Sequence, residues 1–255
     1  MNFVTAFCTD VGIKKKTNQD SMLIQQAETD YGSVLFAAVC DGMGGLAKGE
    51  VASAEAVHML SGWFTQEFPQ ILCDGLDETV LRDSLNALVT ETSNKLGRYG
   101  NKIGVNLGTT IVALLIACGK YYIVNVGDSR AYRITDRIEQ LTHDQTVVQR
   151  EIDMGRLTPE EAAVDPRRSV LLQCVGATDY VVPDFYSGAV AGNENFMLCC
   201  DGFRHVITEE EFYEGLNPHV AVTQQQMQAN LQYFVDTNKY RQETDNISAL
   251  LIHLV

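Results

Sequence analysis

Four aspartates that are far apart in the chain each lie at one end of an apolar run, and a small or turn-forming residue follows each of them. If the apolar runs are strands of one folded unit, the four carboxylates can gather at neighbouring strand ends. A single Asp-Gly pair is far more often a turn than a binding site, so this prediction depends on the four occurring together. The segments are Val39-Cys40-Asp41-Gly42, Val126-Gly127-Asp128-Ser129, Cys199-Cys200-Asp201-Gly202 and Thr244-Asp245-Asn246.

Such a cluster of carboxylates needs compensating positive charge. Two like charges about 4 Å apart repel by roughly 4 kcal/mol at an effective dielectric constant of about 20. Divalent ions would neutralise the cluster and leave a positive local field, which suits a phosphate group. Carboxylate and carbonyl oxygens favour Mg²⁺ or Mn²⁺, and Gly42 frees the backbone after Asp41 to turn a carbonyl toward an ion. Only five histidines are present and none lies in an acidic motif, which disfavours zinc.

The overall composition excludes several classes of function. A net charge of −14 argues against sequence-independent nucleic-acid binding, which needs a basic surface, and against electrostatic attachment to anionic lipid. No apolar stretch approaches the roughly 20 residues of a membrane helix, and residues 1–5 lack the features of a signal peptide. Most of the seven cysteines lie in apolar runs and none form a Cys-x-x-Cys pair, so we expect a reduced, cytoplasmic protein.

Strand-length and helix-length patterns alternate along the chain. Short turns between consecutive strands imply mainly antiparallel pairing, and the long amphipathic helices would cover the sheets. The pattern therefore predicts an α+β fold, a four-layer α-β-β-α sandwich with two mainly antiparallel sheets flanked by helices. No repeat or linker divides residues 1–255, so we expect a single domain. Strands are predicted at 3–8, 22–26, 33–40, 109–118, 121–126, 131–134, 196–200 and 247–254, and helices at 50–68, 80–96, 145–154, from Pro159 onward after an N-cap at Thr158, and at 224–235.

A set of short motifs follows the same order as in a known family. Each motif alone is weak, but the ordered set extends through nearly the whole chain. In these residues the sequence resembles the bacterial metal-dependent protein serine/threonine phosphatases of type 2C. The motifs are Asp10-Val11-Gly12, Asn18-Gln19-Asp20-Ser21, Asp41-Gly42-Met43-Gly44-Gly45 with Gly49-Glu50 and Ala52, Gly108-Thr109-Thr110, Gly127-Asp128-Ser129-Arg130, Leu141-Thr142-His143-Asp144, Asp201-Gly202 and Asp245-Asn246.

The resemblance implies a β-sandwich with a two- or three-metal centre of Mn²⁺ or Mg²⁺ at one end. By this analogy Asp41 bridges two core ions and Gly42 offers its carbonyl to one of them. Asp201 and Asp245 complete the first ion's shell, while Asp128 together with Asp201 holds a third, weaker ion.

For catalysis, the resemblance implies that Asp20 orients metal-bound water. A hydroxide that bridges the ions then attacks phosphorus in line, and no phospho-enzyme forms.

Two positions depart from the family pattern. The family has a phosphate-gripping arginine six residues after the position of Thr9, and this chain has Lys15 there, within Lys14-Lys15-Lys16. Lysine supplies charge but no bidentate fork. Three adjacent lysines are also typical of a solvated turn, and we predict a phosphate role for Lys15 alone. Where eukaryotic members have a histidine after the first Asp-Gly, this chain has Met43, so we expect water to protonate the leaving group.

Residues 145–176 resemble the family's flap beside the metal site. A solvated helical insert is the equally good interpretation of this segment, and Asp165 and Gln173 depart from the family pattern there. The three arginines that favour the flap are Arg156, Arg167 and Arg168. His143, just before this segment, fits an exposed strand end as well as a functional role.

The resemblance predicts an enzyme that hydrolyses phosphoserine and phosphothreonine in proteins and opposes a bacterial serine/threonine kinase. Its partners would be that kinase and its targets, with no nucleic acid or membrane, and it would act as a monomer. A non-catalytic relative that binds phosphoproteins is a rival interpretation, which the presence of all four aspartates disfavours. A phosphatase dedicated to one regulatory protein is a second rival, and a small-molecule phosphatase is a third.

Overall fold

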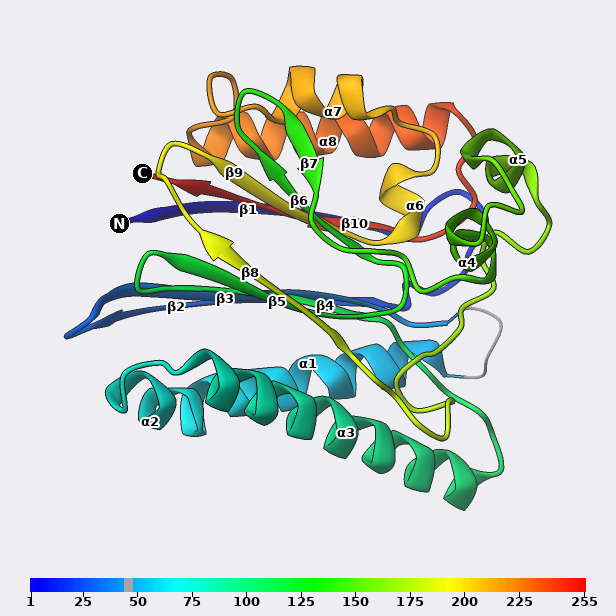
Figure 1. Ribbon diagram of the computed structural model, residues 1–255. Helices are drawn as coiled ribbons and strands as arrows, with labels where there is room; N and C mark the ends of the chain where they lie inside the picture. Colours follow the sequence, from blue (N-terminus) through cyan, green and yellow to red (C-terminus); the bar gives the residue numbers. More distant parts are fainter. Residues whose placement is uncertain (44–47) are drawn as a thin grey trace.

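The computed structural model describes residues 1–43 and 48–255. Two five-stranded sheets stack face to face, and helices cover the outer face of each, which gives four layers (Figure 1). Every strand pair is antiparallel. The predicted α-β-β-α sandwich is therefore confirmed.

Each sheet combines strands from distant parts of the chain. The first has the order β1 (Phe3–Asp10), β10 (Ile247–Leu254), β9 (Asn195–Cys199), β6 (Arg130–Ile134) and β7 (Ile138–Gln140). The second has the order β2 (Asp20–Thr29), β3 (Gly32–Asp41), β4 (Ile111–Ala117), β5 (Lys120–Val126) and β8 (Asp184–Ala189).

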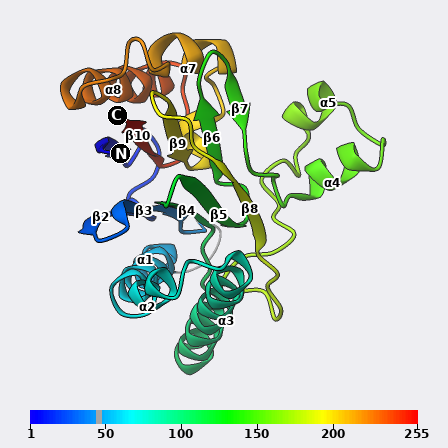
Figure 2. The same cartoon turned by 60° about the vertical axis from the view of Figure 1, so that its left-hand side comes forward.

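The helices divide between the two outer faces and one end of the sandwich. The second sheet is covered by α1 (Gly49–Gln66), α2 (Phe68–Cys73) and α3 (Glu78–Ile103), and the first sheet by α7 (Glu209–Leu216) and α8 (Gln224–Tyr240). The short α6 (Asp201–Arg204) follows β9 directly. Two further short helices, α4 (Val147–Asp153) and α5 (Pro159–Val164), stand apart from the layers, as Figure 2 shows. None of the helices in the described part of the chain is both long and apolar enough to cross a bilayer.

The sequence of β3 is apolar without interruption because both faces of this strand are buried. Its alternate residues face two different cores, because successive side chains of a strand point to opposite faces. Leu35, Ala37 and Val39 pack between the two sheets, whereas Phe36 and its alternate neighbours pack beneath α1 and α3. Trp63 of α1 lies in this second core, with its ring 5.3 Å from that of Phe36.

The structure contains elements that the sequence patterns did not reveal. Strands β7 and β8 lie at sheet edges and are only partly buried, so neither carries a clear apolar pattern. Helix α7 begins with three glutamates and buries only Phe212 and Leu216, and α2 is a single short element after α1. The predicted boundaries also shift: α3 extends beyond 80–96 at both ends, and Cys200 is the N-cap of α6 and not the end of β9.

Candidate metal centre

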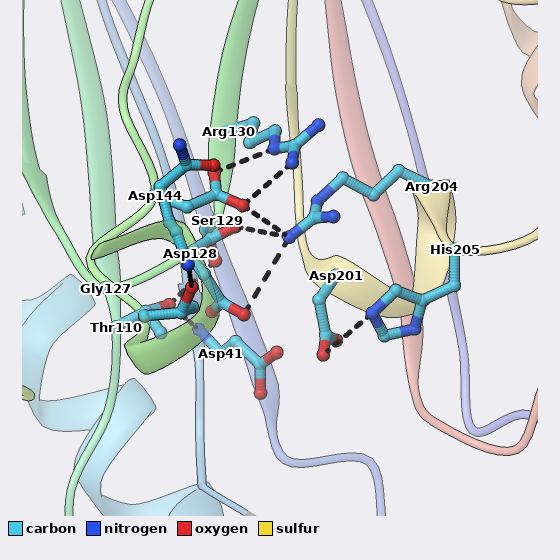
Figure 3. A network of polar contacts seen from close by, with 12 residues as sticks. Asp41, Thr110, Gly127, Asp128, Ser129, Arg130, Asp144, Asp201, Arg204 and His205 are labelled. Atoms are coloured by element: carbon cyan, nitrogen blue, oxygen red, sulfur yellow. Dashed lines mark hydrogen bonds and ion pairs between the residues drawn. The ribbon is translucent and has the colours of Figure 1, made fainter. Parts of the chain in front are cut away.

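The predicted acidic residues come together at one end of the sandwich. Asp41 is the last residue of β3, Asp128 lies in the turn between β5 and β6, Asp201 opens α6, and Asp245 precedes β10 by two residues. Figure 3 shows the carboxylates of Asp41, Asp128 and Asp201 directed toward one another. The four aspartates line one cavity of about 240 Å³ together with Lys15, Met43, Thr110, Ser169 and Leu171.

Hydrogen bonds with Thr109 and Thr110, the two residues before β4, fix the backbone around Asp41. The Asp41 N–H donates to the Thr110 hydroxyl at 3.0 Å, and the Asp41 carbonyl oxygen accepts from the Thr110 N–H at 2.9 Å and from the Thr109 hydroxyl at 2.9 Å. Gly42 follows in a space that admits no side chain, since a Cβ there would lie 2.3 Å from the Gly49 carbonyl oxygen. Residues 44 and 45 of the same motif lie outside the described residues.

Asp20 joins the cluster through strand pairing. It is the register partner of Asp41 in the β2–β3 ladder, so the two side chains start from adjacent backbone positions. Neither carboxylate oxygen of Asp20, nor Oδ1 of Asp201, has a hydrogen-bond partner within residues 1–43 and 48–255, although these oxygens are buried. Orphaned buried oxygens of this kind fit a cation as the missing partner.

Burial and mutual repulsion disfavour the charged forms of these carboxylates. Burial raises the pKa of Asp20 to about 6, with the charges of Asp201 and Asp245 adding to the effect. Burial also raises the pKa of Asp128 to about 7, and the neighbouring Asp201 charge adds to the shift. The pKa of Asp41 is raised well above its ordinary value, first by burial and then by the Asp20 and Asp201 charges. A divalent ion would reverse this balance because it favours the ionised ligands.

The donor set favours hard cations. A cysteine also lies near the cluster: Cys200 Sγ is within 4.8 Å of Asp20 and Asp41 oxygens. This thiol donates to the Asn246 carbonyl oxygen at 3.4 Å and accepts from the Ser248 N–H at 3.2 Å. Burial raises the pKa of Cys200 well above its ordinary value, so the group is a neutral thiol. The remaining candidate ligands are oxygen atoms, which Mg²⁺ and Mn²⁺ prefer.

Lys15 is the lysine of the 14–16 run that reaches the cluster. Its Nζ lies 2.6 Å from Asp245 Oδ1, whereas Lys14 and Lys16 are both exposed. Burial alone would lower the pKa of Lys15, but the hydrogen bond and charge of Asp245, followed by the charges of Asp41 and Asp201, raise it. A permanent positive charge therefore borders the cavity, at the position where we predicted a phosphate contact.

A second polar network borders the cluster and was not predicted. Arg130 makes a bidentate contact with Asp144, with two nitrogen–oxygen distances of 2.8 Å. Arg204 Nη2 donates to the Asp128 carbonyl oxygen at 3.0 Å and to Asp144 Oδ2 at 3.3 Å, and lies 3.8 Å from Asp128 Oδ2 (Figure 3). Burial alone would raise the pKa of Asp144, but the charges of Arg204 and Arg130 lower it.

The same network contains a histidine at the edge of the cluster. His205 Nε2 lies 3.4 Å from Asp201 Oδ2, and His205 Nδ1 lies 3.3 Å from Glu243 Oε2. Burial alone would lower the pKa of His205, but the Glu243 hydrogen bond and the Asp201 charge raise it. His205 follows Asp201 by four residues, a helical spacing that is the one sequence signal for this contact. His143, in contrast, is exposed and pairs with Asp153 at 2.9 Å.

The segment 145–176 contributes to the walls beside the cluster. Ser169 and Leu171 line the acidic cavity, and Arg168 lines an adjoining cavity of about 480 Å³ that also contains Asp128, Arg204 and His205. The other two arginines pair locally: Arg167 with Asp165 at 2.8 Å and Arg156 with Glu151 at 3.4 Å. Of the three arginines in the predicted flap, Arg168 is thus the one that lies beside the cluster.

Comparison with known proteins agrees with this arrangement. Residues 13–236 match the family described as protein phosphatase 2C. The serine/threonine phosphatase Stp of Listeria monocytogenes is 30% identical over 249 residues, which cover 96% of this chain and 94% of that protein. The chain belongs to the protein phosphatase 2C family.

Two further comparisons concern a mycobacterial relative. The serine/threonine protein phosphatase PstP of Mycobacterium tuberculosis is 32% identical over 215 residues, which cover 84% of this chain but 39% of PstP. This chain therefore matches less than half of PstP's length. A crystal structure of the PstP catalytic domain in complex with two manganese ions superposes with a TM-score of 0.80, at 26% identity, over 99% of this chain and 98% of that one.

Proposed function

We propose that this protein hydrolyses phosphoserine and phosphothreonine in other proteins with the help of divalent metal ions. The observation that carries the proposal is the convergence of Asp41, Asp128, Asp201 and Asp245 on one cavity bordered by Lys15. The family relationship and the names of the relatives support the same activity. An acidic cluster that binds cations, next to a lysine, can attract and hold a phosphate group despite the net negative charge of the chain.

The ligand roles that we propose are those implied by the family resemblance, and the placement of the carboxylates around one cavity supports them. Asp41 would be shared by two core ions, and the Gly42 carbonyl, Asp201 and Asp245 would be further ligands. Asp128 and Asp201 would hold a third, weaker ion. When bound, Mn²⁺ or Mg²⁺ lowers the pKa of a water molecule and stabilises the charge on the phosphoryl oxygens. The PstP structure with two manganese ions supports this assignment by analogy.

The protein's own groups would supply binding, orientation and proton acceptance. Asp20 lies beside Asp41 with two unpartnered oxygens, so it can accept a hydrogen bond from the attacking water and orient that water toward phosphorus. Lys15 would attract the phosphoryl oxygens as a point charge, less tightly than a bidentate arginine. Met43 at the cavity wall has no proton to give, so water would protonate the leaving serine or threonine.

The substrates would be the targets of a serine/threonine kinase, whose phosphorylation this enzyme would reverse. We further propose that residues 1–255 work as one monomeric catalytic domain, with residues 145–176 as a flap beside the site. The position of Arg168, Ser169 and Leu171 around the cavities supports the flap assignment.

A metal titration on phosphopeptides tests the proposal. The purified protein should release phosphate from a phosphothreonine peptide when Mn²⁺ is added, lose this activity on chelation, and act poorly on a phosphotyrosine peptide. Asp41→Asn should abolish the activity, whereas Asp136→Asn, at an exposed position in the β6–β7 turn, should leave it unchanged. Full activity of Asp41→Asn would disprove the assignment.

A further inference from the structure

His205 connects two chain segments that each carry a proposed metal ligand. Asp201 and His205 lie at the two ends of the single turn that forms α6, and Glu243 lies in the connection between α8 and β10, two residues before Asp245. The imidazole ring stands between Asp201 Oδ2, at 3.4 Å, and Glu243 Oε2, at 3.3 Å. These contacts link residues about 40 positions apart in the sequence.

In both Asp201 and Glu243, one carboxylate oxygen faces His205 and the other points elsewhere. Asp201 turns Oδ2 toward His205, while its Oδ1 is buried and has no hydrogen-bond partner in the described chain. Glu243 turns Oε2 toward His205, while its Oε1 accepts the backbone N–H groups of Thr244 at 2.6 Å and Asp245 at 2.9 Å. Oδ1 of Asp201 is thus left for an ion. The hydrogen bond from the Asp245 N–H to Glu243 Oε1 fixes the backbone of Asp245.

The link is shielded from water. The side chain of His205 is 19% exposed and that of Glu243 8%, so the contacts operate at lower effective dielectric than a surface pair. Each ring nitrogen faces one carboxylate oxygen, so the ring spans the space between the two segments.

We propose that His205 and Glu243 form a positioning relay that orients Asp201 and fixes the backbone of Asp245 for metal binding. The inference rests on the proposed function of the acidic cluster as a metal centre. Neither residue needs to touch an ion or the substrate. Groups that hydrogen-bond to metal ligands orient those ligands, and their loss typically weakens metal affinity about ten- to hundredfold.

Mn²⁺ binding measured directly tests the relay without relying on activity. We would titrate the metal-free protein with Mn²⁺ and follow the free ion by electron paramagnetic resonance. His205→Ala should raise the dissociation constant of the tightest Mn²⁺ site about ten- to hundredfold, and His205→Gln, which keeps one donor, should give a smaller increase. At saturating Mn²⁺ the KM for an aryl phosphate should stay within about twofold of the wild-type value, because the relay does not contact the substrate.

A double variant distinguishes a relay from general destabilisation. Glu243→Ala should weaken Mn²⁺ binding in the same way, and His205→Ala with Glu243→Ala should be no weaker than the worse single variant, because both changes break one path. Independent, multiplying effects in the double variant would contradict the relay. His143→Ala is the matched control, since His143 also pairs with a carboxylate but is exposed, and it should bind Mn²⁺ like the wild type.

The two ways in which the inference could fail are separable. A folded His205→Ala protein that binds Mn²⁺ as tightly as the wild type would overturn the relay and leave the metal centre intact. Wild-type protein that binds no Mn²⁺ would overturn the proposed function itself, and the relay with it.

Discussion

Replacing Asp128 by asparagine should stabilise the metal-free protein, although it removes a proposed ligand. The folded-state pKa of about 7, against an ordinary value of 3.8, corresponds to about 4 kcal/mol at pH 8, because each pKa unit is worth about 1.4 kcal/mol. This pKa already includes the attraction of Arg204, whose Nη2 lies 3.8 Å from Asp128 Oδ2 and lowers the value. We therefore expect a net gain of about 2 to 4 kcal/mol in the free energy of unfolding, the lower figure allowing for contacts that an asparagine amide does not reproduce.

The pH dependence of this gain follows from the direction of the pKa shift. Between its unfolded and folded pKa values, the folded protein keeps a proton on Asp128 that the unfolded chain has lost. The contribution of this group to stability therefore falls as the pH rises, and it reaches its lowest value above about pH 7. The advantage of Asp128→Asn should be small near pH 4 and fully developed at pH 8.

Asp144→Asn is the matched control, for which we expect the opposite change in the free energy of unfolding. Asp144 is as well buried as Asp128, but Arg130 and Arg204 lower its pKa. Its neutralisation leaves two partly buried guanidinium groups without their shared partner and should cost about 3 to 5 kcal/mol.

Thermal unfolding in EDTA at pH 5 and pH 8 checks both variants. In a domain of this size 1 kcal/mol shifts Tm by about 2 to 4 °C, so Asp128→Asn should melt at least about 4 °C above the wild type at pH 8. A lower Tm for Asp128→Asn, or a higher one for Asp144→Asn, would refute the electrostatic reasoning.

Two further substitutions test the cavity and its backbone. Lys15→Ala should raise the KM for a phosphothreonine peptide about tenfold or more, since one charge-assisted contact is worth roughly 1.5 to 3 kcal/mol; an unchanged KM would remove Lys15 from phosphate binding. Gly202→Ala should destabilise the protein by about 1 to 3 kcal/mol and weaken Mn²⁺ binding, because its Cβ would lie 2.1 Å from the Asn246 carbonyl oxygen. Its control is Gly62→Ala in α1, where a Cβ meets nothing within 4 Å and calorimetry should show equal or greater stability.

The layers of the fold and the meeting of the aspartates were predictable because they depend on local patterns. The uninterrupted apolar run of β3 is long enough to require two buried faces, and Asp41 ends it. The pairing of Asp20 with Asp41 then follows from a tight hairpin between β2 and β3. Edge elements such as β7 and β8 were missed because their exposed faces carry no apolar period.

The surroundings of the cluster depend on contacts that no local pattern records. Arg204 reaches Asp144 and Asp128 across 60 and 76 residues of sequence, and Glu243 reaches His205 from another connection. Histidine is absent from the acidic motifs themselves, which gave no sign that His205 borders the cluster. Such positions are fixed only when the strands that carry them are paired.

Anomalous X-ray scattering from crystals soaked in Mn²⁺ tests the central claim most directly. We predict at least two manganese peaks between the carboxylates of Asp41, Asp201 and Asp245, and none at these positions in Asp41→Asn. A wild-type protein that hydrolyses phosphothreonine peptides while its manganese lies elsewhere, or is absent, would contradict the account.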